Sequence, residues 1–134
     1  MLRMIFAFLA GAVAMSLTVA GLQAVGHAVW PLSAGIDPND AAQMPGFVEA
    51  MPLAAKVFVL VRYAIATAVA VLVATLIARP RWKGLGIALG LLMVGLCAIN
   101  LSLLPHPLWM AIATLVIPLP IALGVARWRR PAVA

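Results

Sequence analysis

The chain has 134 residues, of which 66% are hydrophobic and only 9% are charged, and its mean hydropathy is +1.18. A soluble domain carries roughly 25% charged residues, so this chain has too few charges to cover a surface that faces water. The formal net charge is +6, but the basic residues stand at the ends of apolar runs and are not interleaved with aromatic residues. This pattern excludes a nucleic-acid-binding groove and predicts a membrane protein.

Four apolar runs are long enough to cross a bilayer core of ~30 Å, which needs roughly 20 helical residues. We predict transmembrane helices at about residues 4–28, 54–78, 84–104 and 108–126, with an outer loop at about residues 29–53. The expected fold class is an all-α membrane protein. Residues 1–134 are expected to form a single domain of four transmembrane helices in an antiparallel bundle, with short helices in the outer loop.

The first run is longer than the apolar core of a signal peptide, which has roughly 7–15 residues, so we interpret it as a crossing. Gln23 and His27 are four residues apart and share one face of this helix, and Ser16 and Ala20 continue that face inward. The polar part of the face therefore lies near the outer end of the helix.

The outer loop contains the segment "GIDPNDAAQMPGFVEAMP". Asp37 suits an N-cap and a proline suits the position after it, which predicts a short helix from Pro38 to about Gln43. A second short helix is predicted from about Pro45 to Met51, lying along the membrane surface on its apolar face. A calcium loop through Asp37, Asn39 and Asp40 is the alternative. It lacks the glycine and the closing glutamate of an EF-hand, so we expect no metal there.

Alanines recur at every fourth position of the second predicted helix, at Ala66, Ala70, Ala74 and Ala78, and Arg62 is the next residue outward on the same row. Small residues let membrane helices approach one another closely. We therefore predict that this row is a packing face and that Arg62 faces the inside of the bundle at the outer end of the row.

In the third predicted helix, Gly86 and Gly90 form a GxxxG motif, and the same face continues outward through Met93 and Cys97 to Asn100. Cys97 is the only cysteine, so a disulfide or paired-thiol chemistry within the chain is excluded. We interpret it as a small buried apolar residue.

Pro118 and Pro120 each remove a backbone donor from the fourth predicted helix and should bend it. Thr114, four residues before Pro118, is expected to help satisfy the freed backbone groups. A broken helix marks the binding site of some transporters. No charged residue accompanies this break, so we interpret it as a packing kink.

The basic residues that flank the predicted helices all fall on one side of the membrane if the chain crosses it four times. By the positive-inside rule that side is the cytoplasm. These residues are Arg3, Arg79, Arg81, Lys83, Arg127, Arg129 and Arg130. Trp82 and Trp128 stand beside them, as interfacial aromatic residues do. We therefore expect a bacterial inner-membrane protein with both termini in the cytoplasm and with its acidic residues and both histidines on the outer side.

Arg62 lies ~12 Å into its helix at 1.5 Å per residue, and a charged residue at that depth normally faces the bundle or a wet cavity. Polar side chains of other segments reach a similar depth. We expect them to converge in the outer leaflet as a candidate ligand-binding cluster: Gln23, His27, Arg62, Tyr63, Asn100 and His106. In the alternatives, Arg62 pairs with Glu49 or with loop carbonyls, or it contacts lipid head groups. No catalytic residue, cofactor or metal site is assigned, because two histidines without a third fixed ligand are a weak metal signal.

Three segments, "GHAVWP", "GIDPND" and "LPHPLW", resemble a family of small uncharacterised bacterial inner-membrane proteins with four predicted helices. The resemblance covers most of the chain and rests on the aspartates of the outer loop and on His27, Trp30, Pro31, Pro105, His106, Pro107 and Trp109. It implies the four-helix fold and an acidic residue in relatives at the position of Gln23, but no activity. Small multidrug transporters need a carboxylate in the first helix, which this chain lacks. The membrane-associated eicosanoid and glutathione enzymes share only its size and helix count.

Three hypotheses for function follow. The first is a non-enzymatic integral membrane protein, either an accessory or scaffolding subunit or a small binding module for an outer-leaflet ligand. The alternative is a small oligomeric transporter or channel, although the inner halves of the predicted helices carry almost no polar residues. A second alternative is a membrane enzyme or redox protein that uses His27 and His106, although a catalytic site needs a nucleophile, a base and an orienting group within reach. The expected partners are the lipid bilayer and either further copies of the chain or another membrane protein.

Overall fold

The computed structural model describes residues 1–37, 39–78 and 81–129. Its helices are α1 (Leu2–Val29), α2 (Met44–Ala50), α3 (Leu53–Ile77), α4 (Trp82–Leu103), α5 (Leu108–Val116) and α6 (Pro118–Trp128). The described part of the chain contains no strand, so the predicted all-α class is confirmed.

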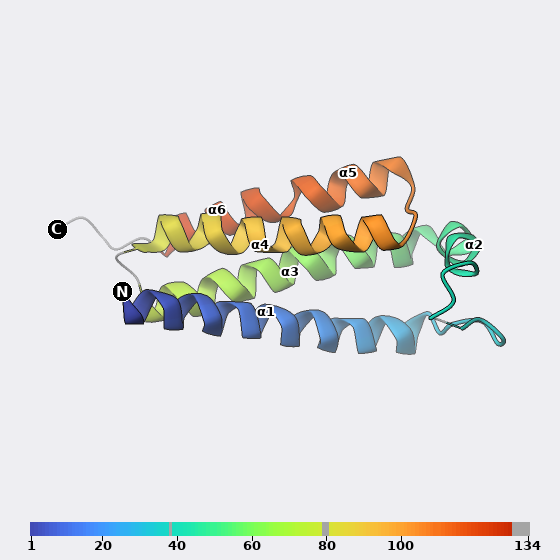
Figure 1. Cartoon of the computed structure of the whole chain (residues 1–134), viewed down its shortest axis with the longest axis horizontal. Helices are drawn as coiled ribbons and strands as arrows, with labels where there is room; N and C mark the ends of the chain where they lie inside the picture. The colour runs from blue at the N-terminus through green and yellow to red at the C-terminus, as the bar shows by residue number, and fades with distance from the viewer. Residues whose placement is uncertain (38, 79–80, 130–134) are drawn as a thin grey trace.

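Four long apolar segments among the described residues are able to span a membrane, namely α1, α3, α4 and the pair α5–α6. They contain between 21 and 28 residues, which corresponds to about 32–42 Å and exceeds a hydrocarbon core of ~30 Å. Figure 1 shows them side by side, each running opposite to the one before it. The predicted antiparallel bundle is confirmed, and we conclude that the chain is an integral membrane protein.

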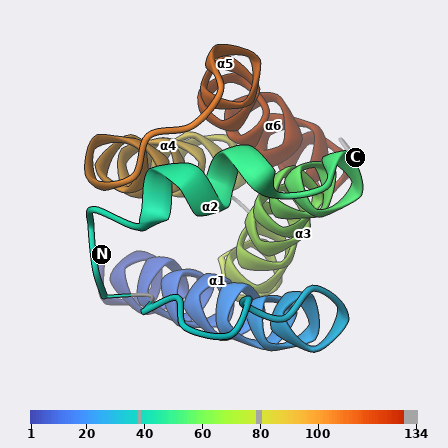
Figure 2. The ribbon, with the colours of Figure 1, turned by 90° about the vertical axis from the view of Figure 1, so that its right-hand side faces the viewer.

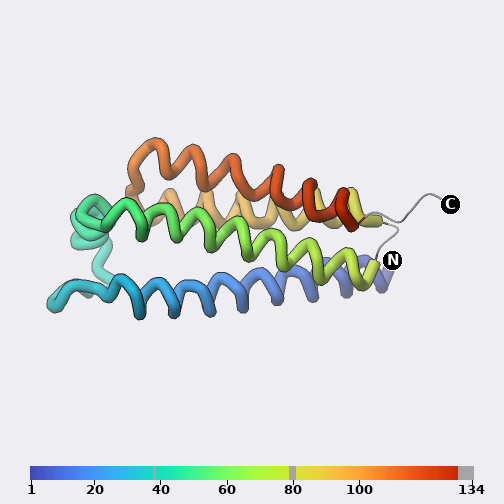
Figure 3. Tube along the Cα trace, turned by 180° about the vertical axis from the view of Figure 1, so that it is seen from behind, coloured from blue at the N-terminus to red at the C-terminus, as the bar shows by residue number. Residues whose placement is uncertain are grey.

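The two ends of the bundle differ in charge. The start of α1, the end of α3, the start of α4 and the end of α6 lie together at one end, which we call the basic end (Figure 1). The view from behind places α2 and the long loop before it at the other end, which we call the α2 end (Figure 3). The described residues that charge the basic end are Arg3, Arg81, Lys83, Arg127 and Arg129, whereas Arg79 and Arg130 lie outside the described residues. The α2 end carries the acidic residues Asp37, Asp40 and Glu49.

The alanine row of α3 is buried along its length. Ala66, Ala70 and Ala74 have 0% of their surface exposed, and Ala78 has 3%. The predicted packing face is therefore confirmed. Because alanine side chains are small, neighbouring helices can approach the backbone of α3 closely on this side.

Gly11 of α1 packs closely against that row. A Cβ atom at Gly11 would stand 2.8 Å from the carbonyl oxygen of Ala70 and 2.9 Å from Leu89 Cδ1 of α4. At Gly11, α1 is therefore in close contact with both α3 and α4. This contact was not predicted from the sequence, although Ala7 and Gly11 form a pair of small residues four apart, which is the signal of such a contact.

The GxxxG motif of α4 packs against α6. A Cβ atom at Gly86 would stand 2.7 Å from the Cβ atom of Ala126, and one at Gly90 would stand 3.0 Å from the Cβ atom of Ala122. The predicted close contact is confirmed, and its partner is the last crossing of the chain.

The last crossing is interrupted at Ile117, between α5 and α6 and directly before Pro118. Ile117 nevertheless keeps helical angles (φ −63°, ψ −42°), so the bend expected from the prolines stays a prediction. The role predicted for Thr114 is wrong. Its hydroxyl donates to the carbonyl oxygen of Met110 at 2.7 Å. A threonine hydroxyl inside a helix finds the carbonyl oxygen four residues earlier as its nearest acceptor, so it is directed away from the break.

The loop at the α2 end contains one of the two short helices that the sequence predicts. α2 begins and ends within one residue of the predicted bounds, Pro45 and Met51. The helix predicted from Pro38 to Gln43 is wrong for residues 39–43, which form turns. Pro38 itself lies outside the described residues.

The aspartates of this loop explain the turns. Asp37 Oδ1 accepts a hydrogen bond from the N–H of Asn39 at 2.8 Å, and Asp40 Oδ1 accepts one from the N–H of Ala42 at 2.9 Å. Aspartate side chains that bind the backbone two residues ahead stabilise turns in competition with a helix. Gln43 Nε2 also donates to Asp40 Oδ2 at 2.8 Å, which ties the turns to the start of α2.

Candidate functional site

A cavity of about 500 Å³ lies at the α2 end of the bundle. Its walls come from α1, α3 and α4, and residues of α2 line it as well. Figure 2 looks along the bundle from the α2 end and shows α2 crossing from the side of α1 and α4 towards α3. The volume falls within the range of small-molecule pockets, roughly 300–1,000 Å³.

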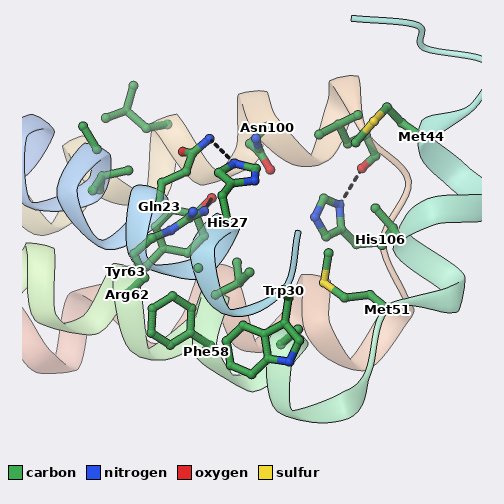
Figure 4. A pocket seen from close by; sticks show the side chains of 18 of the residues that line it. Gln23, His27, Trp30, Met44, Met51, Phe58, Arg62, Tyr63, Asn100 and His106 are labelled. Atoms are coloured by element: carbon green, nitrogen blue, oxygen red, sulfur yellow. Dashed lines mark hydrogen bonds between the residues drawn. The ribbon is translucent and has the colours of Figure 1, made fainter. Parts of the chain in front are cut away.

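All six residues of the predicted polar cluster line this one cavity. Gln23 and His27 come from α1, Arg62 and Tyr63 from α3, Asn100 from α4, and His106 from the link before α5. Figure 4 shows their side chains around the same space. The structure therefore brings the six residues together, and their role in binding a ligand stays a prediction.

Arg62 is half-buried and lies about 13 Å from the start of α3 at Leu53, at 1.5 Å per residue. One of its Nη atoms donates to Tyr63 Oη at 3.1 Å, and the guanidinium carbon lies 4.9 Å from the centre of the tyrosine ring. The Nε atom is buried and donates to none of the described residues. Arg62 is thus positioned by a cation–π contact and one hydrogen bond, and most of its donors are unused.

The partners that the sequence analysis proposed for Arg62 differ from the one observed. Among the described residues, its hydrogen bond goes to Tyr63 and not to Glu49. Glu49 is exposed on α2, and its carbonyl oxygen accepts a hydrogen bond from Lys56 Nζ at 3.1 Å. The proposed pair between Arg62 and Glu49 is therefore absent, because α2 lies across the cavity and Glu49 is not among the residues that line it.

Gln23 and His27 contact each other along α1. The amide nitrogen of Gln23 lies 3.4 Å from His27 Nε2, the contact drawn in Figure 4. In this contact the Gln23 amide nitrogen is the donor and His27 Nε2 is the acceptor. Both side chains are exposed on the face of α1 that borders the cavity.

His106 is held by the link on which it lies. Its Nδ1 atom is 2.6 Å from the carbonyl oxygen of Leu104, and because a carbonyl oxygen only accepts, Nδ1 carries the proton. Asn100, which is half-buried on α4, lies at the same end of the cavity as His27 in Figure 4. No group of three or more His, Cys, Asp or Glu side chains able to hold a metal occurs among the described residues.

The apolar walls of the cavity were not identified from the sequence. Trp30 and Phe58 form one wall, with ring centres 5.5 Å apart, and a Cβ atom at Gly26 would stand 3.0 Å from the Phe58 ring. Methionines cover other parts of it, namely Met15, Met44, Met51 and Met93. A signal for Phe58 was present, since it lies one helical turn from Arg62 on the same row. Flexible methionines adapt to ligands of irregular shape.

The cavity opens between α1 and α4. α1 packs mainly against α3 and only lightly against α4. Lining residues on this side are exposed, including Ser16, Ala20 and His27 on α1 and Leu96 on α4. Both helices are long and apolar enough to span a membrane, so the opening lies on the flank of the bundle.

The chain matches no family model, no curated protein and no solved structure. The fold and the cavity therefore define it at the level of a class, which is an integral membrane protein of four helices with a ligand-sized cavity in one half of the bundle. The family resemblance of the three sequence segments stays a prediction.

Proposed function

We propose that the protein is a non-enzymatic binding module of the bacterial inner membrane, which holds an amphiphilic ligand in the cavity at the α2 end. Both termini are in the cytoplasm and the cavity lies in the outer leaflet. The clustering of arginine and lysine at the basic end supports this orientation, because short cytoplasmic links are enriched in these residues.

The observation that carries the proposal is the state of Arg62. A guanidinium at bilayer depth is costly unless it faces a partner or a wet cavity, and a buried donor without an acceptor costs about 1–3 kcal/mol. Arg62 nevertheless has a buried Nε atom with no acceptor among the described residues, beside a cavity of about 500 Å³. A ligand with an acceptor group would relieve this cost, whereas an apolar side chain at this position would avoid it.

Binding is favoured over catalysis by the state of the side chains around the cavity. Tyr63 accepts from Arg62, the His106 ring donates to a backbone carbonyl, and the hydroxyl of Ser16 donates to the carbonyl oxygen of Ala12 at 3.0 Å. A nucleophile activated by a neighbouring base is the signature of covalent catalysis. None of the described hydroxyls that line the cavity is hydrogen-bonded to a histidine or a carboxylate.

Transport is less well supported, because the bundle is packed with apolar side chains between the cavity and the basic end. Gly11 and the alanine row of α3 are in close contact there. The buried hydroxyls of Thr67 and Thr75 donate to carbonyl oxygens of their own helix, Tyr63 and Val71, at 2.7 Å each. These hydroxyls are therefore not available as steps of a polar path.

The test is whether the purified protein retains a ligand in the cavity. Ala20→Phe would place a large side chain at an exposed lining position, whereas Ala24→Phe changes an exposed position on the same helix that does not line the cavity. After purification in a mild detergent and solvent extraction, mass spectrometry should find about one amphiphile per chain in the parent. Ala24→Phe should retain it and Ala20→Phe should lose most of it. Equal retention in all three proteins, or none in the parent, would refute the proposal.

A further inference from the structure

We propose that the ligand of this cavity is an anionic lipid with a small head group, which enters sideways from the bilayer between α1 and α4 and is held at its head by Arg62. The inference rests on the proposed function and adds the charge, the size and the route of the ligand. Three features of the cavity support it: its net charge and its hydrogen-bond donors, which both involve Arg62, and its opening.

The first feature is an uncompensated positive charge. Among the residues that line the described cavity, Arg62 is the only Arg or Lys, and no Asp or Glu lines it. Lys56 is not among the lining residues, and its amine is bound to the carbonyl oxygen of Glu49. A buried charge is normally paired, so the cavity lacks an anion and a neutral ligand would leave Arg62 unpaired.

The second feature is the excess of donors near Arg62. The guanidinium has five N–H donors in a planar fork, of which the structure uses one on Tyr63. The Tyr63 oxygen accepts that bond, so its own proton is free to donate. A carboxylate or phosphate offers only acceptors and fits such a fork.

The third feature is the route to the site. α2 crosses the cavity at the α2 end (Figure 2), while the exposed lining residues lie between α1 and α4, on a side that faces lipid. Apolar side chains such as Met15 and Met93 line the deeper part of the cavity. A lipid reaches this opening with its tail still in the bilayer, whereas a soluble anion would have to cross apolar surface.

The depth of Arg62 limits the head group. α3 has 25 residues and spans about 37 Å against a core of ~30 Å, which places the Arg62 backbone about 10 Å below the edge of the core. The side chain reaches several ångströms towards that edge, but a bulky or zwitterionic head group would still be drawn into the hydrocarbon. A carboxylate or an unsubstituted phosphate is the chemistry that fits.

Trp30 provides a direct reporter, because it lines the cavity next to Phe58. A protein with Trp30 as its only tryptophan is obtained by replacing Trp82, Trp109 and Trp128 with Phe. A matched protein retains only Trp109, which is 44% exposed and does not line the cavity. Both are reconstituted in phosphatidylcholine vesicles and titrated with brominated lipids, which quench tryptophan on contact. The probes are dibromostearate, its uncharged methyl ester and dibrominated phosphatidic acid.

The expected result is that dibromostearate, or phosphatidic acid, half-quenches Trp30 at about tenfold lower content than the methyl ester, which is the effect of one charge-assisted hydrogen bond. Trp109 should respond to all probes alike. Arg62→Met should abolish the preference of Trp30, and Arg62→Lys should keep part of it. A preference for only one of the two anionic probes identifies the head group and supports the inference. If the Arg62 variants fail to fold, the two single-tryptophan proteins that keep Arg62 still test the inference, because quenching by the anionic probes and by the ester is compared between Trp30 and Trp109.

Other outcomes overturn the inference and differ in what they leave of the proposed function. Quenching of Trp30 that exceeds that of Trp109 but is equal for acid and ester means that the cavity binds lipid without regard to charge, so the proposed function survives alone. Reversal of the Trp30 quenching by inorganic phosphate in the buffer means that the ligand is a soluble anion. Equal quenching of Trp30 and Trp109 by every probe removes both proposals.

Discussion

Replacing Gly11 with alanine tests the contact at which α1 meets α3 and α4. The added Cβ atom would stand 2.8 Å from the carbonyl oxygen of Ala70, 2.9 Å from Leu89 Cδ1 and 3.2 Å from the Cβ atom of Ala74. The first neighbour is a backbone atom of a buried helix and cannot rotate away. It is about 0.6 Å closer than an ordinary contact of 3.4 Å, so α1 as a whole has to move.

The magnitude follows from two opposing terms. Overpacking a well-packed interior by one methyl group costs about 1–3 kcal/mol, whereas glycine to alanine within a helix contributes about 0.5–1 kcal/mol of stability. Gly21 lies on the same helix, and a Cβ atom there meets nothing within 4 Å. Gly21→Ala should therefore show only the favourable term. The free energies of unfolding of the two variants should differ by about 1–3 kcal/mol, with Gly11→Ala the less stable.

The assay is unfolding by titration with sodium dodecyl sulfate in mixed micelles, followed by the loss of helical circular dichroism. Parent, Gly11→Ala and Gly21→Ala are measured in the same detergent, so that effects of helix propensity cancel between the two variants. A difference smaller than about 0.5 kcal/mol, the scatter expected for surface substitutions, would show that Gly11 is not a close contact. The assembly of α1, α3 and α4 derived from it would then be wrong.

Three further predictions concern other parts of the molecule. Gly90→Leu should lower the melting temperature in detergent relative to Gly95→Leu, because a Cβ atom at Gly90 meets α6 whereas one at Gly95 meets nothing within 4 Å. Equal melting temperatures would mean that the Gly90 face of α4 is exposed to lipid and not packed on α6. In protein from which the ligand has been extracted, Arg62→Leu should leave the free energy of unfolding unchanged or raise it by up to about 1–3 kcal/mol, since it removes a buried unsatisfied donor; a loss of similar size would instead mean that Arg62 is a structural anchor. A cysteine at the exposed position Ala42, in a Cys97→Ala background, should react with an impermeant maleimide added to intact cells. Labelling only after lysis would mean that the α2 end faces the cytoplasm.

The fold could largely be predicted from the sequence because hydropathy and small-residue spacing are local signals. The four crossings follow from run length, and the faces of α3 and α4 follow from the alanine row and the GxxxG motif. Which faces meet is not local information. The sequence does not show that Gly90 packs on α6 while the alanine row receives Gly11, since every small-residue face is a suitable partner for every other.

The polar part of the candidate site could also be predicted, because polar residues at a shared depth in a membrane helix are rare and tend to meet. Their individual partners could not. Among the described residues, Arg62 binds the neighbouring Tyr63 and neither Glu49 nor Gln23. The partner depends on the side-chain rotamers, which the sequence pattern does not specify. The apolar walls were missed for a different reason: a methionine such as Met93 that lines a cavity and a leucine that faces lipid carry the same hydrophobic signal.

The contact at Gly11 has a mechanical consequence for the cavity. From Gly11 to His27, α1 extends ~24 Å at 1.5 Å per residue, so the contact at Gly11 and the opening of the cavity lie in opposite halves of the bundle. Packed helices commonly shift by about 1–2 Å. Over the distance from Gly11 to His27, such a displacement of His27 corresponds to a tilt of α1 of only about 2–5°. A tilt of α1 about Gly11, towards or away from α4, would change the width of the opening between α1 and α4 while the contact at Gly11 is kept. A larger side chain at Gly11 that displaces α1 would therefore also change the opening of the cavity, ~24 Å away at 1.5 Å per residue.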